Sequence, residues 1–201
     1  MPRNHYRTRK ACVLYANQIA GLMDKIFKLK DGRTCTIREC VEAHAEAALK
    51  LFRIAAAESD NLARLPDEIK LTPEEEREYI RTHRESRNSI MVLVEVDGSA
   101  VALAGVEGLK LKKFAHHGEL GMSVLRECWR LGIGRAILDY LEAWARQAGL
   151  RKLCLRVYDF NEPAYRLYSC AGFAEEGRLK ADVLRADGTY GDTLYMAKHF
   201  V

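Results

Sequence analysis

The stretch from Trp129 to Gly134, which reads WRLGIG, holds the residues best suited to bind an anion. Gly132 and Gly134 open a helical pattern, and a helix N-terminus offers unpaired backbone N–H groups and the positive end of the helix dipole. Glycine has no Cβ, so a phosphate can approach its main chain. Arg130 and Arg135 can add charge-assisted hydrogen bonds to a diphosphate. The pattern predicts a phosphate site; the alternative is that the glycines only permit a tight turn and close helix packing.

Two common phosphate motifs do not fit this stretch. A dinucleotide fingerprint needs a third glycine, but Ile137 stands at that position, and the motif comes late in the chain. A P-loop needs a Gly-Lys pair followed by Ser or Thr, which is absent. The glycine pair by itself leaves the ligand open.

Other chemistry-bearing side chains are scattered. The six cysteines and six histidines form no CxxC pair and no zinc-site spacing. We therefore expect no metal, and cysteines that are reduced, mostly buried and part of a cytoplasmic protein. No Ser-His-Asp or Cys-His arrangement is evident, and Cys170 is interpreted as a small helix residue rather than a nucleophile.

The composition of the chain limits the classes of protein to which it can belong. The chain has 201 residues, of which 48% are hydrophobic and 30% charged, as in a globular domain. A net charge of +4 is too small to favour nucleic acid unless the basic residues cluster. No apolar run approaches the roughly 20 residues of a membrane span.

The N-terminal residues form a separate feature. Residues 1–23 contain no acid, and four basic residues lie within the first ten. A basic tail is the simple interpretation, and a transit-like, membrane-binding or nucleic-acid-binding segment is the alternative. We expect an extension over residues 1–32 and a single domain over residues 33–201.

The rest of the chain predicts the elements that position the glycines. Thr72 should cap a helix that starts at Pro73, and the Asp97-Gly98 pair should close a hairpin. The expected strands are 34–39, two around that pair, 118–125, 151–158 and two around a turn at 186–188. The expected helices are 41–59, 72–86, one from Gly132 to Gly149, and 161–172. This order predicts an α/β (α+β) domain with a mixed sheet.

Three segments, in order, resemble the GNAT superfamily of acyl-CoA-dependent N-acyltransferases, from about residue 33 to the C-terminus. WRLGIG is similar to the family's acyl-CoA loop, which reads Gln or Arg, two residues, Gly, one residue, then Gly or Ala. LRVYDFNEPAYRLYSCAGFAEEG resembles its second motif, and GRLKADVLRADGTYGDTLYMAKHF is similar to the phosphinothricin and ribosomal-protein branch. Trp129 departs from the pattern where Gln or Arg is usual.

The resemblance implies a fold and a set of site residues. The fold is a mostly antiparallel sheet of six to seven strands with about four helices. The co-substrate is acetyl-CoA, and the strand before the glycine loop splays from its neighbour. The implied diphosphate contacts are Arg130, Leu131, Gly132, Ile133, Gly134 and Arg135, and the implied pantetheine contacts are Met122, Ser123, Val124 and Asn161. Tyr168 matches the tyrosine that protonates the leaving thiolate.

Structural roles compete with several of these assignments. Asn161 also fits a plain helix N-cap, and Tyr168 fits an amphipathic core residue. Tyr165, three residues earlier, competes with Tyr168 as the acid. Glu119 is the candidate general base, acting directly or through water, and a surface glutamate is its alternative.

These residues predict an N-acetyltransferase in which a primary amine attacks the thioester directly in a ternary complex. The acceptor is a small-molecule amine or a protein N-terminus, and a homodimer is possible. A non-catalytic acyl-CoA-binding sensor is the alternative. The acceptor should enter where helices 41–86 and the hairpin 180–192 approach the splayed strands. Acids between residues 59 and 76 either attract a cationic amine there or serve as helix starts.

Overall fold

Strand β3 (Ile90–Val96) shows how the sheet divides its two faces. Side chains alternate between the faces of a strand. The even-numbered residues belong to one core cluster and two odd-numbered residues to another: Ile90, Val92, Val94 and Val96 against Met91 and Leu93. The first cluster includes Ile137 and Leu141, and the second includes Ala48 and Ile80. Helices therefore cover both faces of the sheet.

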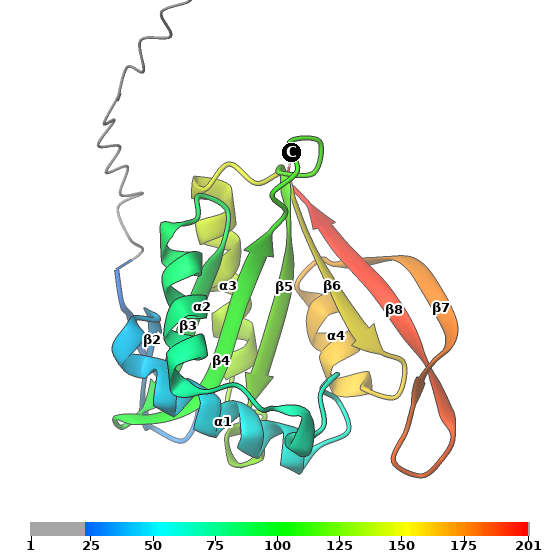
Figure 1. Ribbon diagram of the computed structural model, residues 1–201, viewed down its shortest axis with the longest axis horizontal. Helices are drawn as coiled ribbons and strands as arrows, with labels where there is room; N and C mark the ends of the chain where they lie inside the picture. Colours follow the sequence, from blue (N-terminus) through cyan, green and yellow to red (C-terminus); the bar gives the residue numbers. More distant parts are fainter. Residues whose placement is uncertain (1–22, 201) are drawn as a thin grey trace, which may run out of the picture.

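The computed structural model describes residues 23–200, and within them the chain forms one eight-stranded sheet and four α-helices (Figure 1). The sheet order is β1 (Lys25–Lys28), β2 (Thr34–Glu39), β3, β4 (Ser99–Gly108), β5 (His117–Val124), β6 (Lys152–Tyr158), β8 (Tyr190–His199) and β7 (Ala174–Leu184). The helices are α1 (Ala45–Glu58), α2 (Pro73–Glu85), α3 (Ile133–Gln147) and α4 (Glu162–Cys170). Every neighbouring pair is antiparallel except β5 and β6. The expected mixed, mostly antiparallel α+β fold with four helices is confirmed.

One strand was not expected. β1 pairs with β2 through the turn at Asp31 and Gly32, where Gly32 has φ +87°. It lies inside the segment 1–32 that was predicted as an extension, and Leu29 after it is buried in the main core cluster. Its four residues are too few to show a clear period. Residues 1–22 lie outside the described residues.

The predicted local signals act as expected. The Thr72 hydroxyl accepts a hydrogen bond from the Glu75 N–H at 3.2 Å, and the Glu75 carboxylate accepts one from the Thr72 N–H at 2.8 Å. This reciprocal capping box starts α2. Asp97 and Gly98 both have positive φ, at +48° and +83°, as a two-residue hairpin turn requires. No helix within the described residues is long and apolar enough to cross a membrane.

The parallel pair β5 and β6 separates after three residue pairs. His117 lies opposite Lys152, and the last pair is Glu119 with Cys154. Beyond that point β5 pairs only with β4, and β6 only with β8. Figure 1 shows the two strands diverging toward the lower end of the view. The expected splay of the strand before the glycine loop is therefore present.

Candidate active site

The separated part of β5 holds the three residues assigned to the pantetheine arm. Met122, Ser123 and Val124 pair with Ala104, Leu103 and Ala102 of β4. On their other side no strand within the described residues continues the ladder. A strand edge of this kind offers backbone N–H and C=O groups that need partners. An extended ligand with amide groups can supply them.

The N-terminus of α3 lies at the same end of β5, after η3 (Arg126–Cys128). Gly132 has φ +97°, and a Cβ added to it would meet no heavy atom within 4 Å. Arg130 also has positive φ, at +63°. The Ala136 N–H donates to the Gly132 carbonyl at 3.1 Å, so the helix ladder begins there. The N–H groups just before it are those that an α-helix leaves free for an anion.

Gly134 joins the helix to the rest of the site by close packing. A Cβ at this position would lie 2.8 Å from Leu167 Cδ2 of α4 and 4.0 Å from Met122 Sδ of β5. The glycine therefore lets α3, α4 and β5 converge. The absence of a side chain at Gly134 serves packing, whereas a side chain at Gly132 would face open space.

The other residues of the glycine loop divide into core and surface. Ile133 is buried and Leu131 half-buried, so only their backbone groups are available to a diphosphate. Arg130 is exposed. Arg135 donates to Asp139 at 2.9 Å and to the Cys170 carbonyl at 3.1 Å. Its guanidinium therefore ties α3 to α4, which reduces what it can offer to a ligand.

Trp129 takes a role that its family position does not suggest. Its indole N–H donates to the Val124 carbonyl at 2.7 Å, and the Arg126 guanidinium stacks on its ring at 5.5 Å. The Arg126 backbone N–H donates to Glu58 of α1 at 2.7 Å. The tryptophan thus fixes the end of β5 to the loop, where a Gln or Arg would offer a side-chain donor to the ligand.

Asn161 and Tyr168 lie at opposite ends of α4. The Asn161 side-chain oxygen accepts a hydrogen bond from the Ala164 N–H at 3.4 Å, which confirms the N-cap. Its amide nitrogen makes no hydrogen bond to a described residue. Tyr168 is 7% exposed, and burial raises its pKa to about 12. Its hydroxyl, which has no hydrogen-bond partner among residues 23–200, stays protonated at neutral pH.

Glu119 stands at the last paired position before the strands separate. Arg156 of β6 contacts its Oε1 through Nε at 2.8 Å and through a terminal nitrogen at 2.6 Å. Oε2 makes no hydrogen bond to a described residue. Glu119 is half-exposed, so it is both a surface glutamate and a carboxylate at the divergence. Arg156 was missed from the sequence because its pairing with Glu119 depends on the register of β5 and β6.

The expected acceptor side is where the linker after α1 meets the final hairpin. The Ala186 N–H donates to Asp60 at 3.1 Å, and Tyr158 stacks on Phe160 at 5.2 Å. Burial raises the pKa of Tyr158, Arg156 opposes that effect, and Asp182 and Asp60 add to it. These elements therefore meet as expected.

Three of the six acids between residues 59 and 76 serve local structure. Glu68 accepts from the Leu65 N–H at 2.9 Å, and Glu75 completes the cap of α2. Glu74 pairs with Arg77 at 2.8 Å. The helix-start interpretation therefore accounts for these acids.

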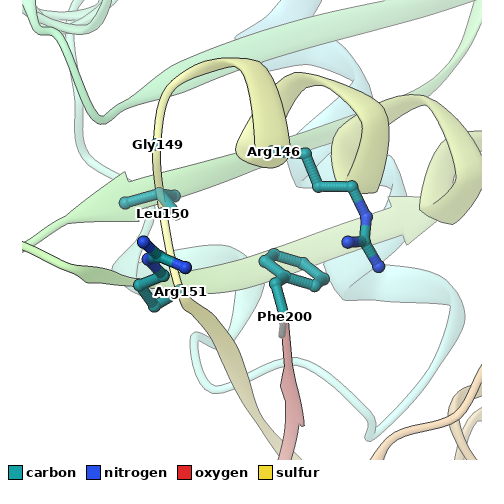
Figure 2. Close-up of a pocket in the computed structure, with 5 residues that line it drawn as sticks. All are labelled: Arg146, Gly149, Leu150, Arg151 and Phe200. Atoms are coloured by element: carbon teal, nitrogen blue, oxygen red, sulfur yellow. The ribbon is translucent and has the colours of Figure 1, made fainter.

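Two surface hollows lie away from the separated strands. One of about 310 Å³ is lined by Arg146, Gly149, Leu150, Arg151 and Phe200 at the far end of α3 (Figure 2). The other, of about 440 Å³, lies between α2 and the end of β4. Within residues 23–200 no three His, Cys, Asp or Glu side chains gather to hold a metal ion. Three of the described cysteines are buried, and Cys170 is exposed.

Residues 56–173, more than half of the chain, match the model of the acetyltransferase (GNAT) family. The chain belongs to this family. Camello of Xenopus laevis, named as an N-acetyltransferase, is 30% identical over 91 residues, which are 44% of this chain and 40% of that protein. The Bacillus subtilis protein YwnH, which bears the name of a phosphinothricin acetyltransferase, is 25% identical over 154 residues, 76% of this chain and 91% of its own.

Solved structures share the fold. A GNAT acetyltransferase from Streptococcus pneumoniae superposes with a TM-score of 0.80 at 27% identity, covering 83% of this chain and 99% of that one. A phosphinothricin acetyltransferase from Sinorhizobium meliloti, solved with acetyl-CoA, has a TM-score of 0.73 at 18% identity, covering 83% and 88%. At that identity the likeness concerns the fold alone.

Proposed function

We propose that this protein transfers an acetyl group from acetyl-CoA to a primary amine by direct attack in a ternary complex. The observation that carries the proposal is the separation of β5 from β6 after Glu119, with the glycine-opened start of α3 at the same end. An unpaired strand edge suits an amide-containing arm, and a helix N-terminus suits a diphosphate. Coenzyme A contains both groups.

The residues present fit this ligand. The open space over Gly132 and the free N–H groups before Ala136 would hold the diphosphate, with Arg130 beside them. The free edge of Met122, Ser123 and Val124 would bind the pantetheine arm. Asn161 would add a donor through the amide nitrogen that its cap does not use.

Acetyl-CoA would supply an activated acetyl thioester, so the chain needs no nucleophile of its own. Tyr168 would hold the proton that the departing sulfur requires. Its raised pKa suits this role, because the phenol stays protonated over the whole neutral range. Glu119 is the proposed general base, acting directly or through water. Its Oε2 is available to accept the proton of the attacking amine, while Arg156 holds Oε1.

The acceptor is proposed to be a small-molecule amine or a protein N-terminus. Support comes from the meeting of the α1 linker with the turn at Ala186 beside the separated strands. Asp60 and Asp182, both close enough to influence Tyr158, provide negative charge that would attract an ammonium group. An amine panel with thiol release as the readout would identify the acceptor.

Substitution of Tyr168 by phenylalanine tests the mechanism. The ring packs against Phe173 with centroids 6.0 Å apart, and this contact survives the change. We expect kcat to fall about 100-fold, the usual scale for losing a general acid, with the Kd for acetyl-CoA unchanged. Tyr165→Phe on the same helix is the matched control and should retain full activity. Full turnover by the Tyr168 variant would contradict the assignment. Absence of thiol release by the unaltered chain with every amine, despite acetyl-CoA binding, would favour a non-catalytic acyl-CoA-binding module.

A further inference from the structure

The end of the sheet opposite the separation of β5 from β6 carries a surface that the proposed reaction does not use. Three turns form it: 86–89, 109–116 and 148–151, at the upper end of the view in Figure 1. The Asn88 side chain donates to the Leu109 carbonyl at 3.2 Å, and the Arg151 N–H donates to the His116 carbonyl at 2.6 Å. These bonds hold the three turns together. We call the surface formed by the turns 86–89, 109–116 and 148–151 the basic end.

The three turns of the basic end carry five cations and no acidic residue, and the carboxylates of Glu85 and Glu107 line the hollow that Lys110 borders. The turns read SRNS, LKLKKFAH and AGLR, without Asp or Glu. The five cations are exposed, and none forms an ion pair with a residue that the structure describes: Arg87, Lys110, Lys112, Lys113 and Arg151. Free cations also occur elsewhere among residues 23–200, so what sets the basic end apart is that five of them gather in three adjoining turns.

Large apolar side chains interleave with the lysines. Leu109, Leu111 and Phe114 are 42%, 68% and 46% exposed. The Phe114 N–H donates to the Leu111 carbonyl at 2.8 Å, which closes a turn between them. The segment is a turn between two strands, and these three apolar side chains are exposed on it, while Lys110 borders the hollow beside α2. Exposed apolar groups that gather in one place mark an interaction site.

A hollow of about 310 Å³ opens beside these turns, with Arg146 and Arg151 in its lining. Figure 2 shows the ring of Phe200 between the two arginine side chains. Arg146 stacks on that ring at 4.4 Å and pairs with Glu142 at 2.9 Å, whereas Arg151 forms no ion pair with any residue between 23 and 200. The hollow therefore adds a cationic recess next to the projecting apolar residues.

We propose that the basic end docks on an anionic membrane surface. Lysines attract negatively charged headgroups, and the interleaved leucines and phenylalanine can enter the boundary between headgroups and acyl chains. A second copy of the chain would bring its own five cations against these five, so self-association through this face is opposed by charge. Nucleic acid would use the cations but not the projecting leucines, since bases stack on aromatic rings and arginines.

The placement of the basic end leaves the proposed active site accessible. The turns 109–116 and 148–151 precede β5 and β6, whereas these strands separate at their C-terminal ends. A membrane bound at the first end would leave the second facing the solvent. Docking would then concentrate the protein at a surface without covering the site.

The test is co-sedimentation of the full chain with vesicles of phosphatidylcholine, alone or with phosphatidylserine in roughly equal parts. The triple variant K110Q/K112Q/K113Q should reduce binding to the anionic vesicles about 100-fold, at roughly fivefold per cation. The variant Leu111→Ser with Phe114→Ser keeps every charge and should reduce binding at least about tenfold. Both variants should keep the thermal midpoint and thiol-release activity of the unaltered chain.

Two matched controls keep the test specific. K30Q/K50Q/K70Q removes three exposed lysines elsewhere, and Leu184→Ser removes an exposed leucine of the final hairpin. Both should bind as the unaltered chain does. The proposal fails if K30Q/K50Q/K70Q loses as much binding to the anionic vesicles as K110Q/K112Q/K113Q does. It also fails if the variant Leu111→Ser with Phe114→Ser binds the anionic vesicles as tightly as the unaltered chain. The contact would then be purely electrostatic, and an acidic protein would fit this surface equally well.

Discussion

Substitution of Gly132 by alanine isolates the anion site from the fold. The added Cβ would meet no heavy atom within 4 Å, so the cost to the fold is the backbone strain of φ +97° alone. For an L-residue this strain is about 1–2 kcal/mol, and in a chain of this size it lowers Tm by roughly 2–8 °C. The methyl group would occupy the open space above the free N–H groups. Loss of one hydrogen bond to a charged group costs about 1.5–3 kcal/mol, so the Kd for acetyl-CoA should rise by roughly 10- to 100-fold.

Gly149 supplies the matched control at the other end of the same helix. It has φ +77°, and a Cβ added there would also meet no heavy atom within 4 Å. Gly149→Ala should therefore cost similar stability while leaving acetyl-CoA affinity unchanged. Calorimetric titration with acetyl-CoA and thermal unfolding of both variants measure the two quantities. Equal affinity of the two variants for acetyl-CoA would refute a diphosphate site at Gly132.

Three further outcomes follow from contacts of the site. Trp129→Phe removes the indole donor to the Val124 carbonyl, so the free energy of unfolding, measured by thermal unfolding, should fall by about 1 kcal/mol. The KM for acetyl-CoA should rise severalfold. Unchanged values of both quantities would show that this hydrogen bond does not fix the end of β5. Glu119→Gln keeps the shape of the side chain beside Arg156 but removes the proposed base. The value of kcat should fall about 100-fold, and the remaining rate should rise with pH as the amine deprotonates. A normal kcat would show that Glu119 is only a surface residue. The pKa of Tyr168 is raised from 10 to about 12, so its neutral form stabilises the fold fully below pH 10 and the contribution is lost as pH rises toward 12. Urea unfolding at about pH 11 should show roughly 1 kcal/mol less stability than at about pH 8, and Tyr168→Phe should lack this part of the loss.

Local chemistry explains why most of the fold could be predicted. Thr72 with Pro73 and Glu75 forms a helix start whose bonds lie within four residues. Asp97 and Gly98 accept positive φ, which sets the hairpin between β3 and β4. Signals of this kind act between neighbours in sequence, so they can be identified without knowing the fold. β1 lacked such a signal, because four residues at a sheet edge show too little alternation.

The site was predictable only in part, because its contacts join separate elements of the fold. Glu119 meets Arg156 through the register of a parallel pair whose last residue pair is Glu119 with Cys154. Arg135, whose assignment to the diphosphate stays a prediction, also reaches the Cys170 carbonyl at the end of α4, a contact that the sequence did not indicate. Trp129 gave no sign in the sequence that its partner would be a carbonyl five residues earlier. The contacts of Glu119 and Arg135 depend on the packing of elements distant in sequence, and that of Trp129 depends on how the loop after β5 folds back on the strand.

Trp129 also determines how the proposed site must bind its anion. At this position a Gln or Arg would offer the ligand a side-chain donor, whereas the indole N–H is already committed to Val124. The Arg126 guanidinium is held over the indole ring, and its backbone N–H is held by Glu58. In the proposed site the diphosphate would therefore bind the backbone N–H groups around Gly132 and Arg130. Donors fixed by a helix backbone lose little conformational freedom on binding, and this preorganisation can offset the missing side chain. We therefore expect the tryptophan to fix the end of β5 and the main chain to recognise the ligand.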